Sequence, residues 1–374
     1  MKKVALVALV VLVAVCSAGA AGAFLLYSRM HAPFRGYSAP ELLVDIPPGE
    51  GTRAIGQRLS DAGVVRDALT FRLALKVSGN ARGLKAGEYR FDRPMSMLEV
   101  IDKIARGDVD VLSVTFPEGL TIAEMAAIFE ARGFGAASTF ISAAHDASAI
   151  QALDPAARDL EGYLFPDTYS LPRRAPASRA VRAMVERFQQ VVTPEVRAAA
   201  EARGLTVRQL VTLASIVEKE TARADERPLV AAVYSNRLKL GMGLQSDPTV
   251  IYALQRGGTF SGNLHRDDLR IDSPYNTYRY PGLPPGPIAA PGKASLEAAA
   301  KPAEVDYLYF VSRNDGSHEF GRTLDEHNRN VQKYQVQYFR DLRAGRAGEA
   351  GGAGEAGKAR GAGEAGKAGK AGRQ

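Results

Sequence analysis

An α+β fold preceded by an apolar N-terminal helix is what this sequence of 374 residues predicts. Three observations support the prediction: an uncharged N-terminal run, two strand–turn–helix units at a fixed offset, and an Asp-Gly hairpin signal followed by a helical pattern. The length suggests two or three domains. The composition, 46% apolar and 24% charged, is ordinary for a globular protein and argues against wholesale disorder or a polytopic membrane protein.

The formal net charge of +7 comes largely from the two ends of the chain. Lys2 and Lys3 contribute +2 and residues 344–374 contribute +3, which leaves +2 for everything between. The sequence therefore predicts no nucleic-acid partner, which would require a basic patch on a folded face. Residues 344–374 repeat Ala-Gly-Glu and Ala-Gly-Lys units, and we expect this low-complexity tail to be disordered.

Residues 4–28 contain no charged side chain and are long enough, at roughly 37 Å of helix, to span a membrane. The two preceding lysines favour a cytoplasmic N-terminus. A cleavable signal peptide is the alternative, because residues 17–23 are small. The apolar run continues through Tyr27, so we favour a single-pass anchor in the cytoplasmic membrane. Either interpretation places the remainder of the chain outside the cytoplasm.

Residues 44–63 and 114–133 match each other at an offset of 70. Pro47 corresponds to Pro117, and glycines recur at matching positions of both segments. Each segment predicts a short strand, a Pro-x-Gly turn and a helix that ends at a C-cap glycine. Two such units are too few for a solenoid, and they indicate a duplicated element.

The first unit belongs to a module that we place at residues 41–110. After it, residues 85–91 predict a strand, and Met97, Ile101 and Ile104 form a helical stripe. The module is therefore small and α+β. Binding of an extended polymer and a plain spacer role are nearly equal interpretations of it.

Thr206 begins a predicted helix that runs to Thr221, with a capping box completed by Gln209. Glu218 and Glu220 lie about 80° to either side of the middle of its apolar stripe. A carboxyl group at such a margin can have its pKa raised by desolvation, as a general acid requires. On periodicity alone, an ordinary charged helix end is the favoured interpretation.

The turn Gln245-Ser246-Asp247 lies between two glycines and an apolar helical pattern. Its side chains could hydrogen-bond a polyol, or Ser246 and Asp247 could cap the following helix. These two interpretations are equal and compatible.

Residues 273–292 contain five prolines from position 281 onward, preceded by Tyr275, Asn276 and Tyr278, which excludes a helix or a central strand. We favour a rigid binding loop over a disordered linker, because linkers rarely carry such closely spaced tyrosines. The chain has no Trp, so stacking on a sugar would fall to Tyr.

Asn314-Asp315-Gly316 predicts a hairpin turn, with a helix after the second strand. His318, His327 and Asn328 around this hairpin are candidates for site chemistry. Neither a His-x-x-x-His nor a Glu-x-x-His pair is present, so we predict no metal site and no cofactor.

Several long stretches resemble the bacterial endolytic murein transglycosylases: LASIVEKET, RLKLGMGLQSDPTVIYAL, YNTYRYPGLPPGPIAAPG and AEVDYLYFVSRNDGSHEF, with EGYLFPDTY resembling an upstream motif. The resemblance implies a LysM-like module at 41–110 and an α+β catalytic domain at 111–340. It also implies a lyase that cleaves the MurNAc–GlcNAc bond within nascent peptidoglycan strands, leaves 1,6-anhydro-MurNAc ends and terminates elongation. The single catalytic carboxylate of the family falls on Glu220.

We expect Gln245, Asp247, Tyr275, Asn276 and Tyr278 to bind the glycan. Peptidoglycan synthases, the penicillin-binding proteins, are possible partners. Two alternatives remain at this point. One is a muramidase that pairs Glu220 with Asp247, and the other is a membrane-anchored peptidoglycan-binding protein without catalysis.

Overall fold

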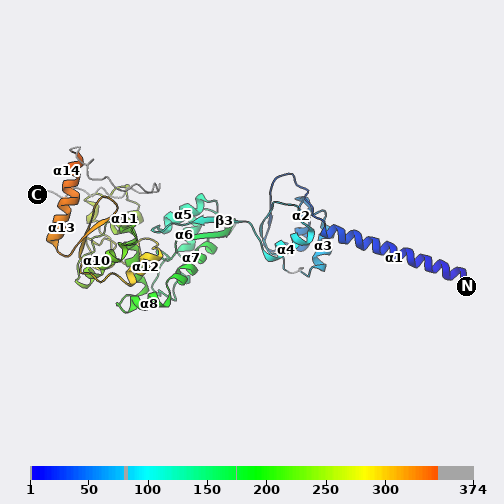
Figure 1. Cartoon of the computed structure of the whole chain (residues 1–374), viewed down its shortest axis with the longest axis horizontal. Helices are drawn as coiled ribbons and strands as arrows, with labels where there is room; N and C mark the ends of the chain where they lie inside the picture. The colour runs from blue at the N-terminus through cyan, green and yellow to red at the C-terminus, as the bar shows by residue number, and fades with distance from the viewer. Residues whose placement is uncertain (1, 80–82, 174, 344–374) are drawn as a thin grey trace. The chain divides into compact units, whose positions relative to one another are not determined.

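The computed structural model describes residues 2–79, 83–173 and 175–343, and Figure 1 follows the chain from its N-terminus in blue to the orange helices α13 and α14. Its residues divide into two compact units. Unit 1 comprises the chain up to Ser113 together with Ser170–Ala175, and unit 2 comprises Val114–Tyr169 and the chain from Pro176 onward. The mixture of helices and strands confirms the predicted class, whereas the tail 344–374 lies outside the described residues.

Helix α1 (Lys2–His31) contains the apolar N-terminal run. Its span Leu9–His31 has a mean hydropathy of 2.5 over its best window and is long enough to cross a membrane. Met30, near the end of the helix, is buried in the core of unit 1. Among the described residues, one helix is thus of the kind that a single-pass anchor requires.

Unit 1 packs three helices against a two-stranded antiparallel sheet. Strand β1 (Leu42–Ile46) pairs with β2 (Gly87–Phe91), so that Leu42 faces Phe91 and Ile46 faces Gly87. The helices are α2 (Thr52–Asp61), α3 (Ala68–Val77) and α4 (Met97–Arg106). Alternate strand residues meet one helical face in a shared core that includes Val44, Tyr89, Phe71 and Ile101.

The duplicated element is present at both of its predicted places. Strand β1 and helix α2 form the first copy, and strand β3 (Val111–Thr115) and helix α5 (Ile122–Ala131) form the second. In both copies the turn glycine and the glycine after the helix are left-handed, with φ between 72° and 81°: Gly49, Gly63, Gly119 and Gly133. A side chain at these positions would strain the backbone, which explains why glycine recurs at the offset of 70.

Unit 2 is mostly helical. Strand β3 pairs with β4 (Thr168–Pro172), and the division between the units falls within this pair. The elements that follow in chain order are α6 (Ala137–Ala144), η1 (Ala147–Ala149), α7 (Ala177–Val191), α8 (Pro194–Glu201), α9 (Val207–Glu220), α10 (Arg227–Lys239), α11 (Asp247–Arg256), η2 (Asp268–Arg270) and α12 (Lys293–Ala300). Helices α7 and α8 are separated by only two residues, Val192 and Thr193. Pro194 starts α8 and Thr193 caps it, which ends α7.

Helix α9 lies at the centre of unit 2, and all residues from Leu210 to Val217 are buried. Helices α8, α10, α11 and α12 pack around it. The proline-rich stretch also contributes, because Ile288, Ala289 and Ala290 are buried there. The disordered-linker alternative for this stretch is wrong, since its backbone is hydrogen-bonded into the core, for example from Ile288 N–H to Ser215 Oγ at 3.1 Å.

The predicted hairpin is confirmed. Strand β5 (Tyr309–Ser312) pairs antiparallel with β6 (His318–Gly321), and Asn314 in the turn has φ 67°. Helix α13 (Leu324–Val331) follows with a capping box at Thr323, and a π-helical turn η3 (Gln332–Gln337) leads to α14 (Tyr338–Arg343).

Replacement of Phe71 by Ala should destabilise unit 1 by roughly 3–5 kcal/mol, because the ring is fully buried in its core. Leu69 on the same helix is 65% exposed, so Leu69→Ala should change little. Hydrogen–deuterium exchange of the β1 and β2 amides in detergent measures the local free energy of opening. Equal effects of the two substitutions would contradict this core assignment.

Candidate active site

Glu220 is the last residue of helix α9, and its side chain is half-buried. The capping box of Thr206 and Gln209 is present, as the sequence predicts, and determines where the helix begins. Thr221 then takes an extended conformation with φ −141°, so the chain leaves the helix directly after Glu220. The carboxyl group therefore stands at the end of a helix that is otherwise embedded in the protein.

Two hydroxyl groups hold one oxygen of this carboxyl group. Tyr234 Oη on helix α10 donates to Glu220 Oε1 at 2.5 Å, and Ser246 Oγ donates to the same atom at 2.6 Å. Within the described ranges, no hydrogen bond is made to Oε2. The carboxyl group is thus oriented through one oxygen while the other stays available to an incoming group.

Burial raises the pKa of Glu220 above its ordinary value, and the Asp247 carboxylate raises it further. The hydrogen bonds from Ser246 and Tyr234, and the nearby His318, oppose this shift without cancelling it. Glu220 therefore retains a proton to a higher pH than an exposed glutamate does. That property is what a general acid requires.

Ser246 is the N-cap residue of helix α11, yet its hydroxyl makes no cap hydrogen bond. The capping interpretation for Ser246 is wrong, because its hydroxyl is directed to Glu220 instead. Its own N–H donates to Thr277 Oγ1 at 3.0 Å, which ties the turn to the tyrosine-rich loop. The helix still begins well, with Asp247 in its first turn and Pro248 beside it.

Three of the predicted glycan-binding residues lie with exposed side chains on this turn and loop. Asp247 Oδ1 accepts a hydrogen bond of 2.6 Å from Tyr278 Oη. Gln245 has a left-handed backbone, φ 53°, and its N–H donates to Thr277 O at 3.2 Å. Asp247 and Tyr278 are both close enough to Glu220 to interact with it electrostatically.

Asn276 occupies a different position from that expected of a ligand-binding side chain, because it is fully buried. Its amide donates to Leu269 O and Ile271 O, both at 2.9 Å, and its Oδ1 accepts from Tyr278 N–H at 3.0 Å. A direct contact with a glycan would have to replace these bonds. Asn276 instead determines the path of the loop that carries Tyr278.

Tyr275 packs on helix α11. Its ring lies 5.0 Å from that of Tyr252, with the Arg256 guanidinium 5.7 Å from its centre. Tyr252 Oη in turn donates to buried Glu161, and burial raises the pKa of Glu161 to about 8. The two tyrosines thus have different partners, Asp247 for Tyr278 and Tyr252 for Tyr275.

Glu218 is distinguished from Glu220 by its partners. Its side chain is 6% exposed and forms an ion pair of 2.9 Å with Arg227. Its second oxygen accepts the N–H of Gly292 at 2.9 Å, at the end of the proline-rich loop. The interpretation as an ordinary charged helix end is wrong for Glu218, which joins three segments of unit 2.

His318 is the hairpin candidate that lies at the site. Its Nδ1 is 2.7 Å from Glu226 Oε2, its N–H donates to Glu226 Oε1, and Thr221 Oγ1 donates to Glu226 Oε2. Burial would raise the pKa of Glu226, but the bonds from His318 outweigh it and the net shift is downward. His318 is thereby tied to the residue that follows Glu220.

The other hairpin candidates lie elsewhere. The His327 ring stacks on Tyr309 with 5.1 Å between centres, and Asn328 is exposed. Across the ranges that the structure describes, no three His, Cys, Asp or Glu side chains are arranged to hold a metal ion.

Tyr234 and Ser246 are the site residues for which sequence reasoning did not predict contact with Glu220. Tyr234 lies on an apolar helix where periodicity identifies it only as buried. Ser246 has the pattern of a helix cap. No local signal indicates that these hydroxyls converge on one carboxyl oxygen from 14 and 26 residues away.

The fold and site thus define a mixed α and β protein built around one oriented, pKa-raised carboxyl group. The YceG-like family matches residues 44–333. An endolytic murein transglycosylase of Bacillus subtilis (strain 168) is 34% identical over 331 residues, 84% of this chain and 90% of that protein. One of Streptococcus pneumoniae serotype 2 is 32% identical over 81% of this chain, which spans 60% of that longer protein.

A crystal structure of a putative YceG-like protein from Listeria monocytogenes superimposes with a TM-score of 0.53 at 32% identity. The superposition covers 78% of this chain and 99% of that one. The chain belongs to the YceG-like family, which confirms the resemblance drawn from its motifs.

Replacement of Glu218 by Gln should lower the free energy of unfolding of unit 2 by roughly 1.5–3 kcal/mol, because the buried Arg227 then keeps only the more exposed Glu118 carboxylate at 3.3 Å. Glu220→Gln should leave stability unchanged or increase it, because it removes a carboxylate that burial disfavours. Thermal unfolding at neutral pH compares the two. A Glu218→Gln protein as stable as the parent would contradict the structural role of this ion pair.

Proposed function

We propose that this chain is an endolytic murein transglycosylase that cleaves peptidoglycan strands with Glu220 as its single catalytic carboxyl group. The observation that carries the proposal is the half-buried carboxyl, held through one oxygen by Tyr234 and Ser246, with its pKa raised. The names of the Bacillus and Streptococcus relatives support the same conclusion.

In the first step, protonated Glu220 donates its proton to the glycosidic oxygen between MurNAc and GlcNAc. The C1–O bond breaks, the GlcNAc side leaves with a new hydroxyl, and positive charge develops at C1 of the MurNAc. The proton is donated from Oε2 of Glu220, because Oε1 already accepts hydrogen bonds from two hydroxyl groups.

In the second step, the Glu220 carboxylate removes the proton from the C6 hydroxyl of the same MurNAc. The O6 atom bonds to C1 and closes the 1,6-anhydro ring, and Glu220 regains its proton. The substrate supplies its own nucleophile, so a second carboxylate is not needed as it is in most glycoside hydrolases.

Tyr234 and Ser246 serve both steps. Their donation to Oε1 fixes the rotation of the carboxyl group and stabilises the carboxylate that exists between the two proton transfers. The burial of the site opposes this stabilisation, so the pKa of Glu220 stays above its ordinary value.

The exposed side chains of Gln245, Asp247 and Tyr278 are the residues that we assign to contact with the glycan strand. Asn276 acts by shaping the loop, and Tyr275 acts by packing that loop on helix α11. Three of the five residues predicted from the sequence are thereby assigned to direct contact with the glycan.

The remaining parts support a wall-directed arrangement. We assign α1 to a single-pass anchor in the cytoplasmic membrane, with unit 2 on the outer side, because two lysines precede its apolar span. Residues 41–110 of unit 1 are the LysM-like, strand-binding module of this proposal. An association with peptidoglycan synthases follows from the shared substrate and remains a prediction.

Glu220→Gln should fold and bind strands but lose anhydro ends by at least about 10²-fold, because Gln cannot donate a proton to the leaving oxygen. Purified protein, uncrosslinked glycan strands and mass spectrometry of the products measure this loss. Lys293→Gln is the matched control, since Lys293 is an exposed residue of helix α12 whose ammonium pairs with Glu297 on the same helix.

Three product patterns are distinguishable in that assay. Anhydro ends from the parent protein and none from Glu220→Gln support the proposal. Reducing ends identify a hydrolase that uses Asp247 as a second carboxylate, and an absence of new ends identifies a binding protein. An active Glu220→Gln variant would overturn the single-carboxyl mechanism.

Ser246→Ala and Asp247→Asn should shift the alkaline limb of the pH–rate profile in opposite directions. The Ser246 hydrogen bond lowers the pKa of Glu220, so its loss keeps the acid protonated to higher pH. The Asp247 carboxylate raises that pKa, so Asn moves the limb to lower pH. The measurement is turnover at saturating substrate as a function of pH, and the pH at the midpoint of the alkaline limb is compared between the variants. Shifts in the same direction would contradict this account of the site.

A further inference from the structure

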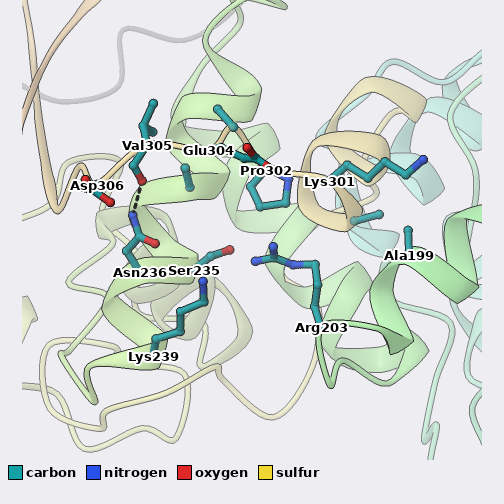
Figure 2. Close-up of a pocket in the computed structure, with 13 residues that line it drawn as sticks. Ala199, Arg203, Ser235, Asn236, Lys239, Lys301, Pro302, Glu304, Val305 and Asp306 are labelled. Atoms are coloured by element: carbon teal, nitrogen blue, oxygen red, sulfur yellow. Dashed lines mark hydrogen bonds between the residues drawn. The ribbon is translucent and has the colours of Figure 1, made fainter.

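A cavity of about 690 Å³ lies in unit 2 among residues that the proposed mechanism does not use. It is bounded by Arg203 after helix α8, by Ser235 and Lys239 on helix α10, and by the segment that follows helix α12 (Figure 2). This volume falls within the range of pockets that hold small organic ligands.

Among the described residues, the buried hydroxyl of Ser235 at this cavity lacks a hydrogen-bond partner, which points to a ligand. Ser235 is 5% exposed, and its Oγ has no hydrogen-bond partner among the residues that the structure describes. A buried hydroxyl without a partner costs free energy, so an occupant that bonds to it would be favoured. In Figure 2 the side chains of Arg203 and Lys239 both reach toward this hydroxyl.

The cations of the cavity also lack partners. No carboxylate lies within ion-pair distance of Arg203, Lys239 or Lys301 in the described parts of the chain, although Glu304 and Asp306 line the same cavity. Partial removal from water lowers the pKa of Arg203. A guanidinium fork, an ammonium and a hydroxyl directed at one point are the donors that a carboxylate or phosphate accepts.

The size and the second half of the lining favour a carboxylate on a larger molecule. A single tetrahedral anion fills only a small part of the cavity. Glu304 and Asp306 also line it, and their carboxylates would repel a polyanion but attract an amine. An occupant with one carboxylate and one amine satisfies both halves.

We propose that this cavity binds the carboxylate end of a short peptide that also bears an amine, the kind of branch that peptidoglycan strands carry. Arg203, Lys239 and Ser235 hold the carboxylate, and Glu304 and Asp306 face the amine. The identification with the wall peptide rests on the proposed function, whereas the carboxylate pocket itself does not.

The test titrates the full chain in detergent with an N-acetylated Ala–isoglutamine–Lys–Ala tetrapeptide, which has one carboxylate and one amine. Calorimetry should show binding that weakens about tenfold or more when the C-terminus is amidated. Arg203→Gln and Lys239→Gln should each weaken binding of the free acid to a similar extent. Lys293→Gln, an exposed lysine outside the cavity, should bind as the parent does.

Each contrary result has a defined meaning. Equal affinity for the acid and the amide overturns the carboxylate assignment, and so does an absence of binding at millimolar peptide. Inorganic phosphate that binds as tightly as the tetrapeptide identifies a free-anion site and overturns the peptide assignment.

The pocket and the proposed function can fail separately. Arg203→Gln should still produce anhydro ends from strands stripped of their peptides, whereas its preference for peptide-bearing strands should disappear. Glu220→Gln should bind the tetrapeptide normally while producing no anhydro ends. Peptide binding without anhydro ends from the parent protein would leave the pocket standing and reject the transglycosylase.

Discussion

The complete burial of helix α9 from Leu210 to Val217 is the constraint on which the rest of unit 2 depends. A helix without a solvent face needs neighbours on every side, and α8, α10, α11, α12 and the proline-rich loop supply them. These same neighbours bring the site together, because Tyr234 arrives on α10 and Ser246 arrives at the start of α11. The elements that bury helix α9 are therefore the same ones that carry the hydroxyl groups to the Glu220 carboxyl group.

The two glutamates at the end of α9 show how one helix terminus performs two tasks. Both carboxylate oxygens of Glu218 have partners, since one pairs with Arg227 and the other accepts the N–H of Gly292. These bonds fix the end of the helix to its neighbours. Glu220 is closed on one oxygen only, and its environment favours the protonated form. The Glu218–Arg227 ion pair, two residues away, helps to hold the Glu220 carboxyl group in position although only one of its oxygens is hydrogen-bonded.

The second copy of the duplicated element also takes part in this arrangement. The N–H of its turn residue Gly119 donates to Ala290 O, and the N–H of Ala290 donates to Leu120 O. The carbonyl oxygen of Gly119 accepts a hydrogen bond of 3.1 Å from the Lys219 ammonium. The turn therefore braces both the loop and the end of α9. In the first copy the equivalent turn belongs to the small sheet-and-helix module, so one local design serves two different settings.

Local features of this protein followed from its sequence, because the physics that determines them acts over a few residues. The capping box of Thr206, the left-handed glycines of the repeat and the hairpin at Asn314 are examples. Periodicity left Glu218 and Glu220 equivalent, since both lie at the margin of one stripe, and only the family motif favoured Glu220. The tertiary structure gives the two glutamates different partners, buries the side chain of Asn276, and brings Tyr234 and Ser246 to Glu220. Those outcomes depend on burial and on contacts between segments far apart in the chain, which no local pattern encodes.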